Sequence, residues 1–183
     1  VKRAKAGKIL ELAGSGLWTG HLSEMEATDL HAVAGRRAMF LVDTSVWIEV
    51  FKKQSRFDLQ SVVQFDEIVT CLPVIQEVLQ GFDDEQAFRT ARDAMHSFPI
   101  VESPLDRGVF NEAVNLFRIA RRGGYTVRSS VDCIIAACAI RHHLTVVHRD
   151  RDFDSLALVS PLITKNLTSR TGVWQTIGLT YPV

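Results

Sequence analysis

Four acidic residues stand at points of the sequence where apolar segments end or helices begin. Asp43 follows the apolar run MFLV, and Asp150 ends the run TVVHRD. Asp132 lies near the start of the apolar segment SVDCIIAACAI, and Glu77 lies inside PVIQEVLQGF. Because ligands bind at the carboxyl ends of the strands in parallel α/β sheets, acids at such positions are candidates for one shared site.

Four carboxylates at one edge of a sheet would repel one another unless a cation lay between them. Hard divalent cations take oxygen ligands, and Mg²⁺ in particular binds a few carboxylates and several waters. A bound ion lowers the pKa of its water and stabilises the negative charge that develops during attack on a phosphodiester. The joint pattern of Asp43, Glu77, Asp132 and Asp150 therefore predicts metal-dependent hydrolysis of phosphodiesters.

Three of the four acids, taken singly, also have a purely structural explanation. Asp43 would serve as the N-cap of the helix that follows it. Asp132 is favoured in the first turn of a helix by the helix dipole, with Ser129 or Ser130 as the cap. Glu77 is expected either at a solvated helix edge or partly buried, where a lone carboxylate is costly unless it is paired or bound to a cation. The combination of four acids, and not any one of them, carries the functional interpretation.

From Met39 onwards, short apolar runs alternate with helical patterns, which predicts an α/β domain with a mostly parallel sheet. Thr44 or Ser45 is placed to cap the first helix, and Gly81 to end the second. The tail, residues 161–183, is expected to add an edge strand or to dock loosely. The expected strands are MFLVD, DEIVTC, FPIVES and LTVVHRD, and the expected helices are TSVWIEVFKK, PVIQEVLQGF, residues 84–97, 106–121 and 130–142, and the short DSLALV, with Asp152 or Asp154 as its cap.

The composition is that of an ordinary globular protein, with 46% hydrophobic and 23% charged residues. Acids and bases balance at 21 each, so any nucleic acid must be attracted by a local patch. Cys71, Cys133 and Cys138 lack the spacing of metal ligands and sit in apolar runs, which predicts buried, reduced thiols. The apolar stretches are too short to span a bilayer, and the basic start lacks the apolar core of a signal peptide, so we expect a cytoplasmic protein without a membrane partner.

The segment RRGGYTVRSS places basic residues close before Asp132. Arg121, Arg122 and Arg128 are candidates for contacts with RNA phosphates, and a solvated surface is the alternative. His142, His143 and His148 are better explained as helix-end and strand-end residues than as metal ligands, because a site built from oxygen ligands needs no imidazole.

The first 26 residues differ from the rest of the chain. KAGKILELAG predicts one or two helical turns, and GSGLWTGHLSEM scatters large apolar side chains among glycines and polar residues. A segment of this kind cannot form its own core, so we expect it to dock on another surface. Its docking side chains would be Leu17, Trp18, Leu22 and Met25.

Four segments in this order, FLVDTSVWIEVF, PVIQEVLQG, SSVDCIIAACAI and HRDRDFD, resemble the PIN domain, and in particular the VapC-type toxins of toxin–antitoxin pairs, across roughly residues 39–160. The resemblance implies an α/β/α sandwich around a parallel sheet, commonly dimeric, and an endoribonuclease that uses Mg²⁺ or Mn²⁺ and cuts RNA. It implies a catalytic role for Asp43, Glu77, Asp132 and Asp150, metal ligation by Asp43, Asp132 and Asp150 with Asp152 sharing or replacing the role of Asp150, and supporting hydroxyls on Thr44 or Ser45 and on Ser130.

Residues 1–26 look like the C-terminal stretch of a VapB antitoxin, which would wrap around the toxin. We therefore expect an antitoxin-like docking segment over residues 1–26, a linker over 27–38 and a nuclease domain over 39–183, with a cognate VapB-like antitoxin as a partner. Two other functions are alternatives to this interpretation. A haloacid dehalogenase-like phosphatase also places an Asp after its first strand, but this chain lacks the second Asp of the motif DxDx[TV]. A catalytically silent PIN-like binding module would usually lack one or more of the acids.

Overall fold

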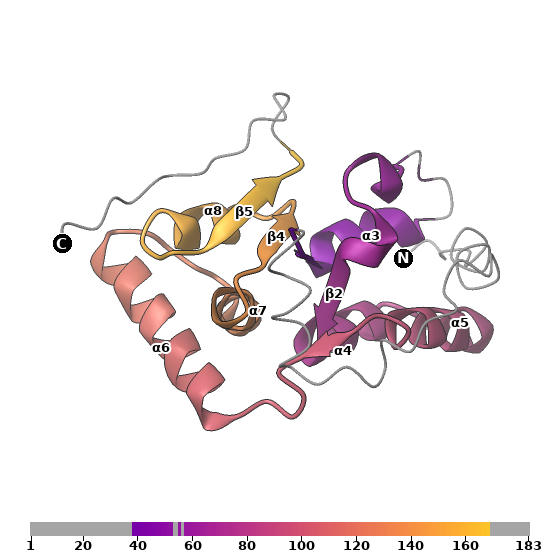
Figure 1. Ribbon diagram of the computed structural model, residues 1–183, viewed down its shortest axis with the longest axis horizontal. Helices are drawn as coiled ribbons and strands as arrows, with labels where there is room; N and C mark the ends of the chain where they lie inside the picture. Colours follow the sequence, from indigo (N-terminus) through magenta and orange to yellow (C-terminus); the bar gives the residue numbers. More distant parts are fainter. Residues whose placement is uncertain (1–37, 53–54, 56, 169–183) are drawn as a thin grey trace.

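The computed structural model describes residues 38–52, 55 and 57–168 (Figure 1). Its centre is a five-stranded sheet in the order β3-β2-β1-β4-β5, and every pair of neighbouring strands is parallel. This sheet confirms the predicted α/β class. The strands are β1 (Phe40–Val42), β2 (Ile68–Cys71), β3 (Ile100–Val101), β4 (Thr145–His148) and β5 (Ile163–Asn166).

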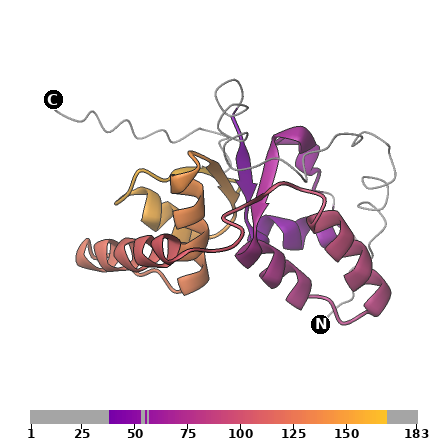
Figure 2. The ribbon, with the colours of Figure 1, turned by 60° about the horizontal axis from the view of Figure 1, so that its bottom comes forward.

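The strands in the middle of the sheet are buried along their whole length, as their apolar sequences predict for strands covered on both faces. Figure 2 shows the helices in two groups on either side of the sheet, α3 to α5 on one side and α6 to α8 on the other. The helices are α3 (Thr44–Phe51), α4 (Leu72–Gln80), α5 (Glu85–Met95), α6 (Arg107–Arg122), α7 (Ser130–Arg141) and α8 (Arg151–Ala157).

The chain leaves β1 and β4, which are neighbours, towards opposite faces of the sheet, because α3 and α8 belong to different helix groups. At such a switch point the two connections separate and leave a crevice at the carboxyl ends of the strands, which is where open α/β sheets bind ligands. Asp43 follows β1, and Asp150 follows β4 after one intervening residue. The topology therefore places both acids at the expected position for a site.

The helix starts agree with the prediction in part. Asp43 is the N-cap of α3, as its structural explanation predicted, while Thr44 and Ser45, the other candidates, are not; Asp150, and not Asp152 or Asp154, caps α8. In both helices the aspartate side chain accepts a hydrogen bond from the backbone N–H two residues later, which an aspartate at the end of a strand is well placed to do. Gly81 follows the last residue of α4, as expected.

The core is built from large side chains of both helix groups and the sheet, among them Leu41, Trp47, Ile135 and Phe153. The three cysteines are buried and free, as predicted. The segment FPIVES forms only the two-residue β3, and the tail contributes the edge strand β5 before residue 169. No helix within the described part of the chain is long and apolar enough to cross a membrane. Residues 1–37 and 169–183, with the predicted docking segment and most of the linker, lie outside the described residues.

Candidate active site

Asp43 lies at the junction of β1 and α3 and is almost fully buried, with 3% of its surface exposed. Its Oδ2 atom accepts hydrogen bonds from the backbone N–H of Ser45 at 2.9 Å and from the Ser45 hydroxyl at 2.5 Å. The same hydroxyl accepts a bond of 2.9 Å from the backbone N–H of Arg149. Ser45 therefore connects the turn after β1 to the turn after β4 and fixes Asp43 between them.

Glu77 projects from the second turn of α4 and is partly buried, which is one of the two positions left open for it by the sequence. The hydroxyl of Thr44 donates a hydrogen bond of 2.8 Å to Glu77 Oε2. Burial raises the pKa of Asp43, and the negative charge of Glu77 raises it further. The two carboxylates are thus close enough to repel each other, and each is held by a hydroxyl of the first turn of α3.

Asp132 lies in the first turn of α7 and has only 8% of its surface exposed. Its backbone N–H donates to the hydroxyl of Ser129, the N-cap of the helix, at 3.2 Å. Burial, followed by the negative charge of Asp43, raises the pKa of Asp132 to about 7. A carboxylate in this position is costly to ionise without a cation.

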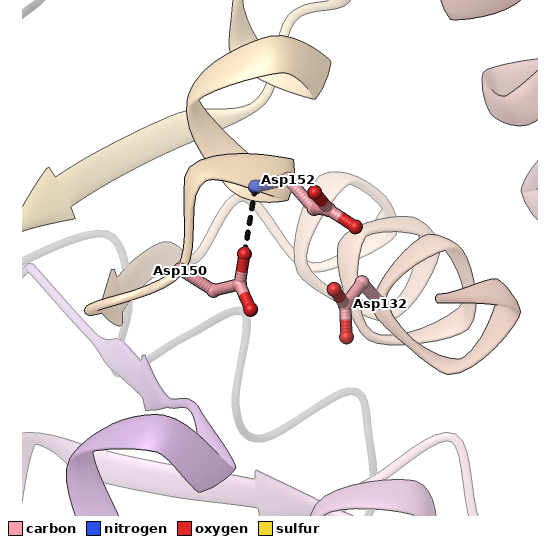
Figure 3. Close-up of side chains that lie close together, drawn as sticks. All are labelled: Asp132, Asp150 and Asp152. Atoms are coloured by element: carbon pink, nitrogen blue, oxygen red, sulfur yellow. Dashed lines mark hydrogen bonds between the residues drawn. The ribbon is translucent and has the colours of Figure 1, made fainter. Parts of the chain in front are cut away.

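Asp150 and Asp152 complete the cluster on the side of α8 (Figure 3). One carboxylate oxygen from each of Asp132, Asp150 and Asp152 lies within 4.8 Å of the other two. Asp150 Oδ1 accepts from the backbone N–H of Asp152 at 3.0 Å and from Arg128 Nη2 at 2.8 Å. Arg128 is thus paired with the cluster.

The carboxylate of Asp152 accepts its hydrogen bonds from a different set of donors. Its Oδ2 accepts the backbone N–H groups of Arg128 at 2.6 Å and of Ser129 at 3.3 Å, and its Oδ1 accepts Arg128 Nε at 3.1 Å. Three donors from one loop therefore converge on a buried carboxylate. Asp152 fixes this loop, and with it the start of α7, against α8.

The structure brings Asp132, Asp150 and Asp152 together as one group of possible metal ligands. Asp43 and Glu77 are not members of that group, but the charge of Asp43 acts on Asp132 and the charge of Glu77 acts on Asp43, with Thr44 and Ser45 beside them. Ser130 is exposed at the first residue of α7, and the capping hydroxyl belongs to Ser129. Arg121 and Arg122 are exposed in the last turn of α6, as expected for either RNA contacts or a solvated surface. The predicted docking residues Leu17, Trp18, Leu22 and Met25 lie outside the described residues.

His148 also belongs to the hydrogen-bond network of the site, which the sequence did not predict. It is the last residue of β4, as predicted, but it is fully buried and its Nδ1 donates to the backbone carbonyl of Asp150 at 2.7 Å. Burial lowers the pKa of His148, so the neutral ring is favoured. A histidine two residues before an acid gives no sign in sequence that it holds the backbone of that acid.

The donor set fits a hard divalent cation. It consists of carboxylates alone, and Asp43, Glu77 and Asp132 have no basic side chain within salt-bridge distance among residues 38–52, 55 and 57–168. Buried carboxylates with raised pKa values gain most from an ion that neutralises them. An ion between Asp43, Asp132 and Asp150 would supply the missing positive charge.

Comparison with known proteins identifies the family of the chain. The family model for the PIN domain matches residues 40–158. Ribonuclease VapC11 of Mycobacterium tuberculosis is 37% identical over 131 residues, which cover 68% of this chain and 96% of that protein. A VapC ribonuclease of Mycobacterium bovis matches with the same identity and coverage.

Solved structures share the fold at lower identity. VapBC2 from Rickettsia felis, solved with a fragment of promoter DNA, has a TM-score of 0.57 at 15% identity and covers 70% of this chain and 98% of that one. VapBC-5 from Mycobacterium tuberculosis has a TM-score of 0.54 at 20% identity, and the match covers 72% of this chain and 100% of that one.

Proposed function

The chain belongs to the PIN-domain family, with VapC ribonucleases among its relatives, and we propose that it is the endoribonuclease toxin of a toxin–antitoxin pair, dependent on Mg²⁺ or Mn²⁺. The observation that supports this most directly is the cluster of Asp132, Asp150 and Asp152, whose carboxylate oxygens lie within 4.8 Å of one another. The charge of Asp43, which follows β1, acts on Asp132, and the charge of Glu77 in α4 acts on Asp43. Two of these acids, Asp43 and Asp132, are buried without a cationic partner in the described part of the chain.

In this proposal Asp43, Asp132 and Asp150 hold the ion, and Glu77 is a further ligand or orients water. When bound, the ion lowers the pKa of water and stabilises the negative charge that develops at the phosphodiester. The chain's own contribution is to fix the carboxylates. The hydroxyls of Thr44 and Ser45 orient Glu77 and Asp43, and the caps of α7 and α8 orient Asp132 and Asp150.

The test is metal-dependent cleavage of RNA by the Asp43→Asn variant. Asparagine caps helices as well as aspartate does, so the change removes a charge and spares the helix start. We expect a loss of about a hundredfold or more in rate, because the ion supplies several kcal/mol of stabilisation.

The matched control is Asp84→Asn, since the side chain of Asp84 is also a helix N-cap, that of α5, but lies outside the acidic site. It should cleave RNA at the wild-type rate. Full activity of Asp43→Asn, or of the wild type in excess chelator, would contradict a metal-dependent mechanism.

For the substrate, we propose that Arg121 and Arg122 contact RNA phosphates, because both are exposed at the end of the helix that precedes the loop to Asp132. Arg128 belongs to the same proposed set, but in this structure it is engaged with Asp150 and Asp152. VapBC-5, which shares the fold, is described as a member of the VapBC family of toxin–antitoxin systems, and we propose a VapB-like antitoxin and a second copy of this chain as protein partners.

We also propose that residues 1–26 restrain the nuclease. Their apolar side chains can bury several hundred Å² on a toxin surface, at about 25 cal/mol per Å² before ordering costs, and the tether gives docking a high effective concentration. Replacing Trp18 with Ala in the full chain should therefore raise the rate of RNA cleavage. An unchanged rate in this variant, and in a chain that begins at Met39, would identify the segment as a passive tail.

A further inference from the structure

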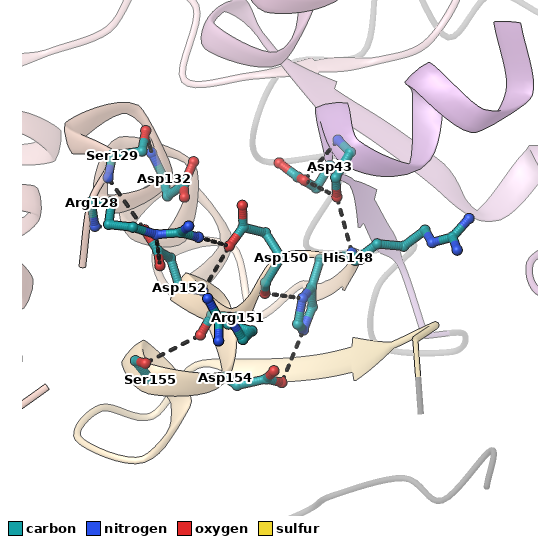
Figure 4. A network of polar contacts seen from close by, with 12 residues as sticks. Asp43, Arg128, Ser129, Asp132, His148, Asp150, Arg151, Asp152, Asp154 and Ser155 are labelled. Atoms are coloured by element: carbon teal, nitrogen blue, oxygen red, sulfur yellow. Dashed lines mark hydrogen bonds and ion pairs between the residues drawn. The ribbon is translucent and has the colours of Figure 1, made fainter. Parts of the chain in front are cut away.

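Arg128 is the one basic side chain that reaches the acidic cluster among the described residues. Its Nη2 lies 2.8 Å from Asp150 Oδ1 and its Nε lies 3.1 Å from Asp152 Oδ1 (Figure 4). An arginine guanidinium is always charged in proteins, so Arg128 brings a full positive charge to Asp150 and Asp152. Arg128 therefore occupies Asp150, which the proposed function requires as a ligand of the metal ion.

The two ends of this ion pair differ in their freedom to move. The side chain of Arg128 is 57% exposed, whereas that of Asp152 is 3% exposed. Asp152 Oδ2 is bound by the backbone N–H groups of Arg128 and Ser129, and these bonds do not depend on the guanidinium. The arginine side chain can therefore leave without loosening the loop or the start of α7.

Asp150 and Asp152 also differ in how many of their carboxylate oxygens are engaged in hydrogen bonds. Both oxygens of Asp152 already accept hydrogen bonds, two of them from the backbone. In Asp150 only Oδ1 does so, from Asp152 and Arg128, and none of the hydrogen bonds within the described residues ends on Oδ2. Asp150 is therefore the acid that can exchange a partner, and Asp152 is a positioning residue.

We propose that Arg128 is a built-in competitor of the divalent cation: in the metal-free protein its guanidinium neutralises Asp150 and Asp152, and the ion displaces it from Asp150. This inference rests on the proposed metal-dependent function. A guanidinium and a divalent ion repel each other across a few ångströms, so both cannot engage Asp150 without cost. The arginine thus lowers the apparent affinity for metal and stabilises the empty site.

The test is the affinity of the full chain for Mn²⁺, measured from the EPR signal of free Mn²⁺, without any substrate. In Arg128→Gln the competitor is absent and the backbone bonds to Asp152 remain. We expect the Kd for Mn²⁺ to fall about fivefold or more, in line with the strength of a partly exposed ion pair. The thermal midpoint without metal should fall, and the rise of that midpoint on adding Mn²⁺ should exceed the rise in the wild type.

Arg149→Gln is the matched control, because Arg149 adjoins Asp150 in sequence but its guanidinium lies 3.5 Å from Glu49. It should change the Kd by less than about twofold, since it removes the same charge without a contact to the cluster. Arg128→Lys keeps the charge and loses the two-point contact, so its affinity should lie between those of the wild type and Arg128→Gln, and it serves if the glutamine variant does not fold.

Unchanged or weaker Mn²⁺ binding in Arg128→Gln, with binding still abolished by Asp43→Asn, would overturn the competition while leaving the metal site intact. An equal increase in the affinity for Mn²⁺ in Arg128→Gln and Arg149→Gln would also overturn it, because the loss of one positive charge anywhere near the site would then explain both results. Absence of Mn²⁺ binding in every variant, the wild type included, would instead refute the proposed metal-dependent function and the inference with it.

Discussion

Asp132 offers a direct test of how much the site costs the fold. Its pKa is raised to about 7, by burial first and by the negative charge of Asp43 second. A carboxyl whose pKa rises from near 4 to about 7 on folding destabilises the native state by about 4 kcal/mol at pH 8 when it is fully desolvated. The neighbouring Asp150 is partly exposed, so solvent screens the site and we halve this to about 2 kcal/mol.

The stability of the folded protein changes with pH because the folded and unfolded states bind different numbers of protons. Between pH 4 and 7 the folded protein holds a proton on Asp132 that the unfolded chain has lost, so the folded state is favoured at low pH. This advantage is complete below the unfolded pKa and is lost as the pH rises through about 7. The wild type without metal is therefore expected to pay its largest penalty at pH 8.

The perturbation is Asp132→Asn, which keeps the shape of the side chain and removes the charge. The assay is urea unfolding of both proteins in chelator at pH 8 and at pH 4.5. At pH 8 the variant should be more stable by about 2 kcal/mol, and at pH 4.5 the difference should shrink to less than half. A variant less stable than the wild type at pH 8, or a difference that does not change with pH, would refute the reasoning.

Three further predictions concern the same site and its substrate. Replacing Thr44 with Val removes the hydroxyl that donates to Glu77 Oε2, and the rate of RNA cleavage should fall about tenfold, if that bond contributes about 1–1.5 kcal/mol; an unchanged rate would show that Glu77 needs no such orientation. The affinity for Mn²⁺ should weaken as the pH falls below about 7, because a proton then competes for Asp132, and titration calorimetry at pH 6 and 8 should show no such trend in Asp132→Asn. Replacing Arg121 and Arg122 with Ala should weaken RNA binding for all sequences alike and reduce the salt slope by about 0.7–0.9 for each lost phosphate contact; an equal slope would leave these arginines as solvated surface.

The fold class was readable from the sequence because its signal is local. Short apolar runs such as that before Asp43 alternate with helical patterns, and each run is long enough for one strand and too short for a helix. The family resemblance was readable for a related reason, since four short segments in fixed order carry it and the family model spans residues 40–158. The acids themselves were visible as residues at the ends of strands and the starts of helices.

The helix caps were less readable. Asp43 and Asp150 follow a strand and cap the next helix. Asp43 was one of three candidate caps, with Thr44 and Ser45, and for the helix after Asp150 the sequence pointed to Asp152 or Asp154 instead. The backbone conformation of the residue that follows the strand decides which side chain reaches the first turn of the helix. Ser129 was favoured over Ser130 at α7 by the same kind of local geometry.

The partners of each acid were decided by tertiary structure alone. Thr44 and Glu77 are 33 residues apart, and Arg128 and Asp152 are 24 apart, so no periodicity or spacing connects them. Sequence showed that Arg128 lies near Asp132 and predicted a contact with RNA, but the packing of α7 against α8 turns it towards Asp150 and Asp152. A charge is attracted to whatever opposite charge the fold brings within a few ångströms, and only the arrangement of the helices around the switch point of the sheet determines which charge that is.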